Sequence, residues 1–187
     1  MSNLDYEINK ELGECYLFMG ELDKAEEYYK KAVVSDAVHP DPYLGLATIA
    51  IHKGEIDDAL TLYRKAEAIE ASDKSLGGIG LVLMEQGKHE EAFECFIKAL
   101  EFNPQNLLLI NTAVQEAHYL NRLPDVMPSL EAALKLNSEL HAVRYALIGC
   151  LIHQGREAEG LAELETLLSL CPEHAEAKEL YEAIKNK

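Results

Sequence analysis

Residues 12–32 read LGECYLFMGELDKAEEYYKKA. After Gly20, the side chains of Ala25, Tyr29 and Ala32 follow one another at steps of four and three residues. This spacing places small, large and small side chains on one stripe of a helix. A glycine tolerates the left-handed conformation in which many helices end. The stretch therefore predicts two helices joined by a tight turn at Gly20.

The same pattern returns along the whole chain. Its turn residues recur at spacings of 34, 33, 34 and 34 residues, as Gly20, Gly54, Gly87, Asn121 and Gly155. Five residues after each turn comes the first position of the stripe, occupied by Ala25, Ala59, Ala92, Val126 and Gly160. The second position, four residues later, holds the large residues Tyr29, Tyr63, Phe96, Leu130 and Leu164. The third position, three residues further on, holds Ala32, Ala66, Ala99, Ala133 and Leu167. One such hairpin has too little core to stand alone, so we expect five of them to stack.

These residues resemble the tetratricopeptide repeat family. The matching sets are Leu12-Gly13, Gly20, Ala25, Tyr29 and Ala32 in the first unit, and Ile79-Gly80, Gly87, Ala92, Phe96 and Pro104 in the third. The resemblance implies an all-α fold, a right-handed superhelical α-solenoid of antiparallel helix hairpins. We expect one domain over 1–187, with repeats at about 6–39, 40–72, 73–106, 107–140 and 141–172 and a capping helix at 173–187.

The resemblance also implies where a ligand binds, because the first helices of the repeats line the concave surface in this family. The candidate binding residues are Phe18, Leu44, Thr48, His52, Leu81, Met84, Asn111, Gln115, His118, Tyr119, Tyr145 and His153. The stripes that carry them contain only three charged members, Lys10, Glu14 and Glu85. An apolar, aromatic and amide surface suits a peptide or helix with apolar anchors. The alternative for aliphatic members such as Leu44 is packing between neighbouring repeats.

These observations favour a non-catalytic adaptor or scaffold that binds a peptide or a helical segment of a partner protein. Two alternatives stay open, a chaperone for secreted or membrane-associated clients and the regulatory repeat portion of a larger enzyme. Self-association is a further option. An enzyme is not expected, because the sequence shows no nucleophile with a spaced base, no phosphate-binding loop and no metal-ligand cluster.

The charge disfavours nucleic acid and anionic membranes as partners. There are 17 basic and 33 acidic side chains, which gives a formal charge of −16, and no basic run exceeds two residues. The N-terminus lacks a signal-peptide pattern and no apolar run reaches the roughly 20 residues of a membrane span, so we expect a cytoplasmic protein without direct membrane insertion.

Neither a cofactor nor a metal is expected. The four cysteines are scattered, without a close pair. His52, His118 and His153 sit near the same end of three first helices, but helices of adjacent repeats lie roughly 10 Å apart, which disfavours a shared zinc site.

Two segments depart from the repeat pattern. Pro128 follows Pro124 by four residues, and an interior proline removes a helix hydrogen bond. We therefore expect the helix over 123–135 to start late or to be kinked. Gly77 and Gly78 lie in the first helix of the third unit, where they allow close approach of a ligand or soften the helix start.

Overall fold

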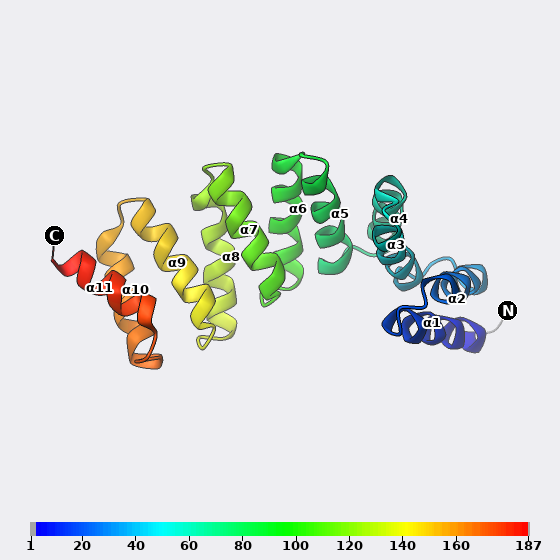
Figure 1. The fold of residues 1–187 in the computed structure, drawn as a ribbon, viewed down its shortest axis with the longest axis horizontal. Helices are drawn as coiled ribbons and strands as arrows, with labels where there is room; N and C mark the ends of the chain where they lie inside the picture. Colours follow the sequence, from blue (N-terminus) through cyan, green and yellow to red (C-terminus); the bar gives the residue numbers. More distant parts are fainter. Residues whose placement is uncertain (1–2, 187) are drawn as a thin grey trace. The chain divides into compact units, whose positions relative to one another are not determined.

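The computed structural model describes residues 3–186, which fold into eleven α-helices without a strand (Figure 1). The helices are α1 Asn3–Phe18, α2 Leu22–Ser35, α3 Asp41–Lys53, α4 Ile56–Ile69, α5 Asp73–Glu85, α6 His89–Phe102, α7 Leu107–Tyr119, α8 Leu123–Leu136, α9 His141–His153, α10 Glu157–Leu170 and α11 Ala175–Lys185. The all-α class is thereby confirmed.

Each predicted turn joins two helices through a left-handed residue. The backbone angle φ is +76° at Gly20, +77° at Gly54 and +73° at both Gly87 and Gly155. Asn121 adopts φ of +57°, the one non-glycine residue with positive φ among the described residues. Asparagine reaches this conformation at lower cost than most side chains, which explains why it can replace glycine in the fourth turn.

The small, large, small stripe of each second helix forms the core. All its members are buried except Tyr63, which is half-buried. Between the two helices of the first hairpin, the ring of Tyr29 lies against Gly13, where a Cβ atom would come within 2.8 Å of the ring. The stripe therefore acts as predicted from its spacing, with the large side chain filling the gap that a small residue leaves open.

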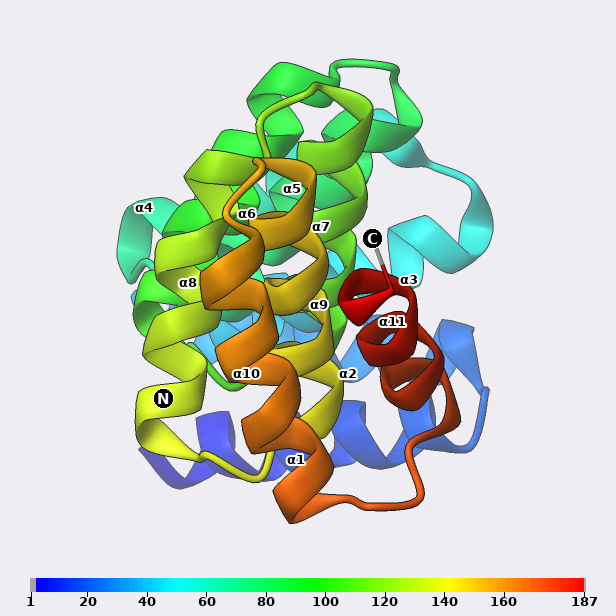
Figure 2. The ribbon, with the colours of Figure 1, turned by 90° about the vertical axis from the view of Figure 1, so that its left-hand side faces the viewer.

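The chain divides into two compact units, Met1–Ala99 and Leu100–Lys187. In the first unit α1 contacts α2 and α3, α2 contacts α3, and α4 contacts both α3 and α5. In the second unit α9 contacts α7, α8 and α10, and α10 contacts α11. Figure 2 shows α7 and α9 on one side of this unit and α8 and α10 on the other. The single domain over 1–187 stays a prediction.

The expected late start of the helix over 123–135 is wrong, whereas the alternative of a kink in this helix stays a prediction. Helix α8 begins at Leu123 and continues through Pro128 to Leu136. Leu123, Val126 and Met127 are buried, so packing holds the first turns in place before the proline is reached. The hydrogen bond that Pro128 cannot make would go to the carbonyl of Pro124, which is exposed and can be hydrated.

Helix α11 covers the end of the second unit. Its Ala177 and Ile184 are buried in a cluster with Ile148, Leu164 and Leu167. Leu180 and Tyr181 of the same helix pack against that cluster, as expected for a helix that caps an apolar face.

Candidate functional site

The candidate binding residues lie on the first helices, and none of them is buried. Eight are exposed, namely Phe18, His52, Leu81, Asn111, Gln115, His118, Tyr119 and His153. The other four are half-buried, namely Leu44, Thr48, Met84 and Tyr145. We call these twelve residues the first-helix face, and we describe its parts in the two compact units separately.

In the first unit, part of this face closes into a small pocket of about 150 Å³. Thr48 and Ile51 line it from α3, and Leu81 and Glu85 line it from α5. These residues come from two neighbouring repeats and occupy equivalent stripes in the sequence. The pocket therefore joins residues that the repeat register predicted to share a surface.

The floor of the pocket includes Tyr63, a residue of α4 that the sequence did not single out as a binding residue. A Cβ atom on Gly78 would lie 2.4 Å from the Tyr63 ring, so the ring occupies the space that this glycine leaves free. Gly78 therefore allows the Tyr63 side chain of the same protein to approach the helix closely. Gly45 occupies the same place one repeat earlier and receives the ring of Tyr29 in the same way. The recurrence of glycine at this place in the repeat is the sequence signal that could have pointed to Tyr63.

The remaining candidates of the first unit lie outside this pocket. Phe18 is 94% exposed at the end of α1. His52 is exposed at the end of α3, and Leu44 and Met84 are half-buried. The hydroxyl of Thr48 donates to the carbonyl of Leu44 at 3.0 Å, so this side chain offers its methyl group and one acceptor to the pocket.

In the second unit, the rings of His118 and His153 meet edge to face, with their centroids 6.2 Å apart. A spacing of roughly 10 Å between helices of adjacent repeats disfavours a shared zinc site, but it leaves room for these two side chains of α7 and α9 to meet. The described residues nevertheless contain no group of three or more His, Cys, Asp or Glu side chains placed to hold a metal ion.

A second ring contact extends this part of the face. Tyr145 of α9 lies 5.0 Å from His174, measured between ring centroids. His174 precedes α11, and its Nδ1 accepts a hydrogen bond from the backbone N–H of Ala177 at 3.3 Å. Tyr119 is 69% exposed at the end of α7, and Asn111 and Gln115 are exposed on the same helix.

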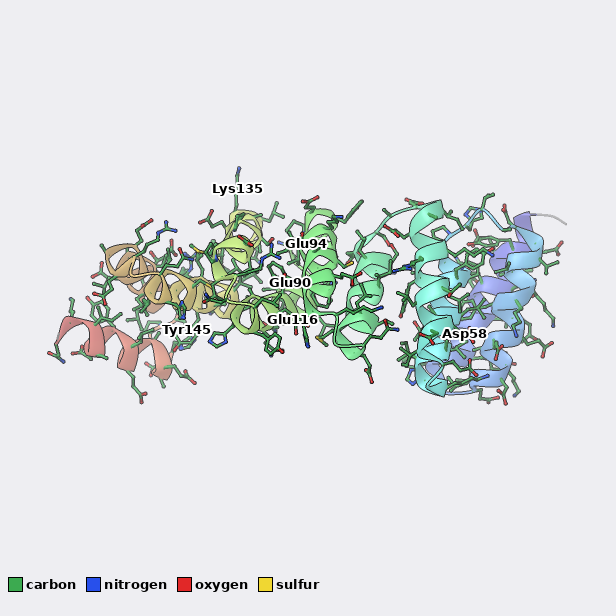
Figure 3. All side chains as sticks on the ribbon, turned by 90° about the horizontal axis from the view of Figure 1, so that it is seen from above. Asp58, Glu90, Glu94, Glu116, Lys135 and Tyr145 are labelled. Carbon is green, nitrogen blue, oxygen red and sulfur yellow. The ribbon has the colours of Figure 1, made fainter. Side chains whose placement is uncertain are left out.

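Many of the acidic side chains lie on the second helices and the outer turns. Exposed carboxylates stand there at Asp23, Glu27, Asp57, Asp58, Glu90, Glu91 and Glu94. In the second unit, Lys135 of α8 projects away from the side on which Tyr145 lies (Figure 3). Burial raises the pKa of Cys95 and Cys150, which keeps both as protonated thiols rather than nucleophiles.

Two regions of the sequence match known sequence families. Residues 10–75 and residues 74–106 each match a family described as tetratricopeptide repeat, and together they span more than half of the chain. The chain belongs to the tetratricopeptide repeat family. Membership of this family supports a scaffold for protein–protein interaction in general.

The chain is also similar to a curated relative and to solved structures. The chain is 31% identical over 114 residues to the BBSome complex member BBS4 of Bos taurus. The matched region is 60% of this chain and 22% of that protein. The crystal structure of YrrB, described as a tetratricopeptide repeat protein with an unusual peptide-binding site, has a TM-score of 0.64 at 16% identity and covers 91% of this chain and 88% of its own. The structure of Pseudomonas aeruginosa PilF has a TM-score of 0.67 at 20% identity. The match covers 94% of this chain and 80% of the PilF chain.

The matched region is between 22% and 38% of the length of the curated relatives. The solved structures are too distant in sequence to show more than the fold. Within residues 3–186, none of the helices is long and apolar enough to cross a membrane.

Proposed function

We propose that the protein binds a peptide or helical segment of a partner protein on its first-helix face, as a non-catalytic adaptor. The observation that carries this proposal is the exposure of apolar and aromatic side chains on that face. Leu81, which lines the pocket of the first unit, is 37% exposed, and Tyr119 is 69% exposed in the second unit.

The chemistry of the face supports an apolar anchor. The pocket of the first unit is lined mostly by apolar and aromatic residues, among them Ile51, Tyr63 and Leu81, together with Thr48 and Glu85. A volume of about 150 Å³ fits one side chain rather than a whole cofactor, since ligand sites usually measure roughly 300–1,000 Å³. Aromatic side chains of the kind exposed in the second unit commonly carry much of the energy of protein interfaces.

A selection from a phage-displayed random peptide library, using the whole chain as bait, provides the first test. Selected peptides should lose about tenfold or more in affinity for the Leu81→Ala or Tyr119→Ala variant, measured by fluorescence anisotropy. Both side chains are exposed, so the substitutions should leave the fold intact, which circular dichroism can check.

Matched controls are available on the second helices. Asp58→Asn and Lys135→Ala alter exposed residues of α4 and α8 and should leave the affinity unchanged. Peptides that bind all four variants equally, or that lose affinity only for the two control variants, would show that the first-helix face is not the binding surface.

A further inference from the structure

The position at the end of each first helix changes its chemistry in the third repeat. In the other four repeats it carries an exposed aromatic side chain, namely Phe18, His52, Tyr119 or His153. The third repeat carries Glu85 there, the last residue of α5. Glu85 is exposed, and it is also one of the residues that line the pocket of about 150 Å³ in the first compact unit. This pocket therefore combines an apolar lining with a carboxylate.

The charge of Glu85 is not balanced within residues 3–186. None of the hydrogen bonds and ion pairs between these residues includes its side chain. Lys88, three residues further on, donates to Gln86 at 2.9 Å, and Lys53 of α3 pairs with Glu26 of α2. The C-terminal end of a helix also carries a partial negative charge. A cation that approaches Glu85 is therefore favoured by both the carboxylate and the end of α5.

We propose that the partner segment places one apolar side chain in this pocket and a lysine or arginine beside Glu85. This inference rests on the function proposed above and adds the class of segment that the site accepts. Glu85 acts as a specificity-determining residue, because it favours a basic residue near the apolar anchor and disfavours an acidic one. The formal charge of −16 on the whole chain favours the approach of a basic segment in the same sense.

The pocket limits the size and polarity of the anchor. An apolar cavity of about 150 Å³ holds a molecule about as large as benzene, which matches the side chain of leucine, methionine or phenylalanine. Ile51, Leu81 and Val82 supply apolar lining, and the hydroxyl of Thr48 already donates to the carbonyl of Leu44. The pocket therefore offers few hydrogen-bond partners to a polar side chain, and an apolar anchor is favoured.

The distance between the two contacts predicts the spacing of the motif. Leu81 and Glu85 stand one turn apart on α5, and Cβ atoms at this spacing are about 5–6 Å apart. Residues three or four apart in a bound helix are separated by the same distance. Residues two apart in an extended segment are separated by about 6–7 Å. We therefore expect a basic residue two to four positions from the apolar anchor.

The test uses fluorescein-labelled peptides from the library selection on the whole chain, with binding measured by fluorescence anisotropy. We expect the selected peptides to contain this motif. Alanine at the anchor should weaken binding about tenfold, and glutamate in place of the basic residue should weaken it about fivefold. The Glu85→Lys variant should reverse this charge preference and bind the glutamate version more tightly. The preference should fade in about 1 M salt, where the screening length is about 3 Å.

Asp58→Lys is the matched control, because it makes the same change of charge at an exposed residue of α4 outside the pocket (Figure 3). It should leave the preference for the basic peptide intact. Circular dichroism checks that both lysine variants are folded.

The outcomes separate this inference from the function on which it rests. Peptides that lose affinity for Leu81→Ala, but whose lysine and glutamate versions bind wild type equally well, would overturn the inference and leave the proposed function standing. Peptides that depend on Tyr119 alone, or that carry a basic residue without an apolar anchor, would do the same. If no peptide is selected, or if neither Leu81→Ala nor Tyr119→Ala weakens binding, both proposals fail.

Discussion

At the scale of single residues, glycines decide how closely neighbouring helices approach. Gly78 and Gly149 both lie inside first helices, but their surroundings differ. A Cβ atom on Gly78 would lie within 2.6 Å of three atoms of the Tyr63 ring, whereas a Cβ atom on Gly149 would meet nothing within 4 Å. The two positions therefore form a matched pair in which the same substitution has opposite consequences.

We expect Gly78→Ala to destabilise the protein by about 1–3 kcal/mol, because the half-buried Tyr63 ring must move. Gly149→Ala should stabilise it by about 0.5–1 kcal/mol, because alanine restricts the unfolded chain and suits a helix interior. Urea unfolding followed by circular dichroism measures both. A loss of stability in both variants, or in neither, would contradict this account of the glycines.

The buried guanidinium of Arg144 is a second feature at the residue scale. Arg144 is 7% accessible, pairs with Glu163 of α10 and donates from Nη2 to the carbonyl of Ser138 at 3.1 Å. Its Nε atom is buried without a hydrogen-bond partner. The positive charge of Arg144 is therefore balanced mainly by the carboxylate of Glu163.

Removing the carboxylate should cost more than removing both charges. We expect Glu163→Ala to lower the free energy of unfolding by about 1–3 kcal/mol, because it leaves a buried cation uncompensated. The double variant Arg144→Leu/Glu163→Ala should recover part of that loss. Thermal unfolding of the two variants gives the comparison, and a double variant less stable than Glu163→Ala alone would refute the explanation.

At the scale of helices, charged pairs link neighbouring repeats. Lys53 at the end of α3 reaches back to α2, where its Nζ lies 2.5 Å from Glu26 and 3.3 Å from Asp23. Hydrogen bonds from Lys30 and then from Lys53 lower the pKa of Glu26. A carboxyl whose pKa is lowered by folding stabilises the protein above its unfolded pKa, and this contribution is lost as the pH falls through the folded value.

We therefore expect Lys53→Met to be less stable than wild type at neutral pH. The difference should shrink as the pH falls below the ordinary range of a glutamate, near pH 4.3, because Glu26 then becomes protonated in both proteins. Urea midpoints over this range measure the effect. A difference that grows towards acid pH would show that the pair acts in another way.

Helix boundaries show what the sequence could and could not predict. The five turn residues, from Gly20 to Gly155, were predictable because a left-handed backbone restricts the residue type. The start of α8 was not, since buried Leu123 and Val126 outweigh the local effect of Pro128. Tertiary packing, which a local pattern does not contain, decided that boundary.

The candidate site was likewise predictable only where a local pattern, rather than tertiary packing, determines it. The first-helix stripes were predictable from the period, and none of their candidate residues is buried. The floor formed by Tyr63 and the contact between His118 and His153 were missed. Both depend on how far side chains reach between helices, and the spacing of helix axes alone does not determine that.

At the scale of the whole molecule, net charge should govern the response to salt. The formal charge of −16 destabilises the folded chain by self-repulsion. Raising the salt from about 0.01 M to about 1 M shortens the screening length from about 30 Å to about 3 Å. We expect the thermal midpoint to rise, because exposed ion pairs that salt weakens contribute little stability. A lower midpoint in high salt would mean that those ion pairs outweigh the repulsion.

The binding surface that we propose lies on the first helices. Backbone amide chemical shifts of the labelled chain, recorded with and without a library-selected peptide, can locate it. We expect the largest changes on first helices, around Thr48 and Leu81 in the first unit or around His118, Tyr119 and His153 in the second. Changes confined to the second helices α2, α4, α6, α8 and α10 would show that the binding surface lies elsewhere.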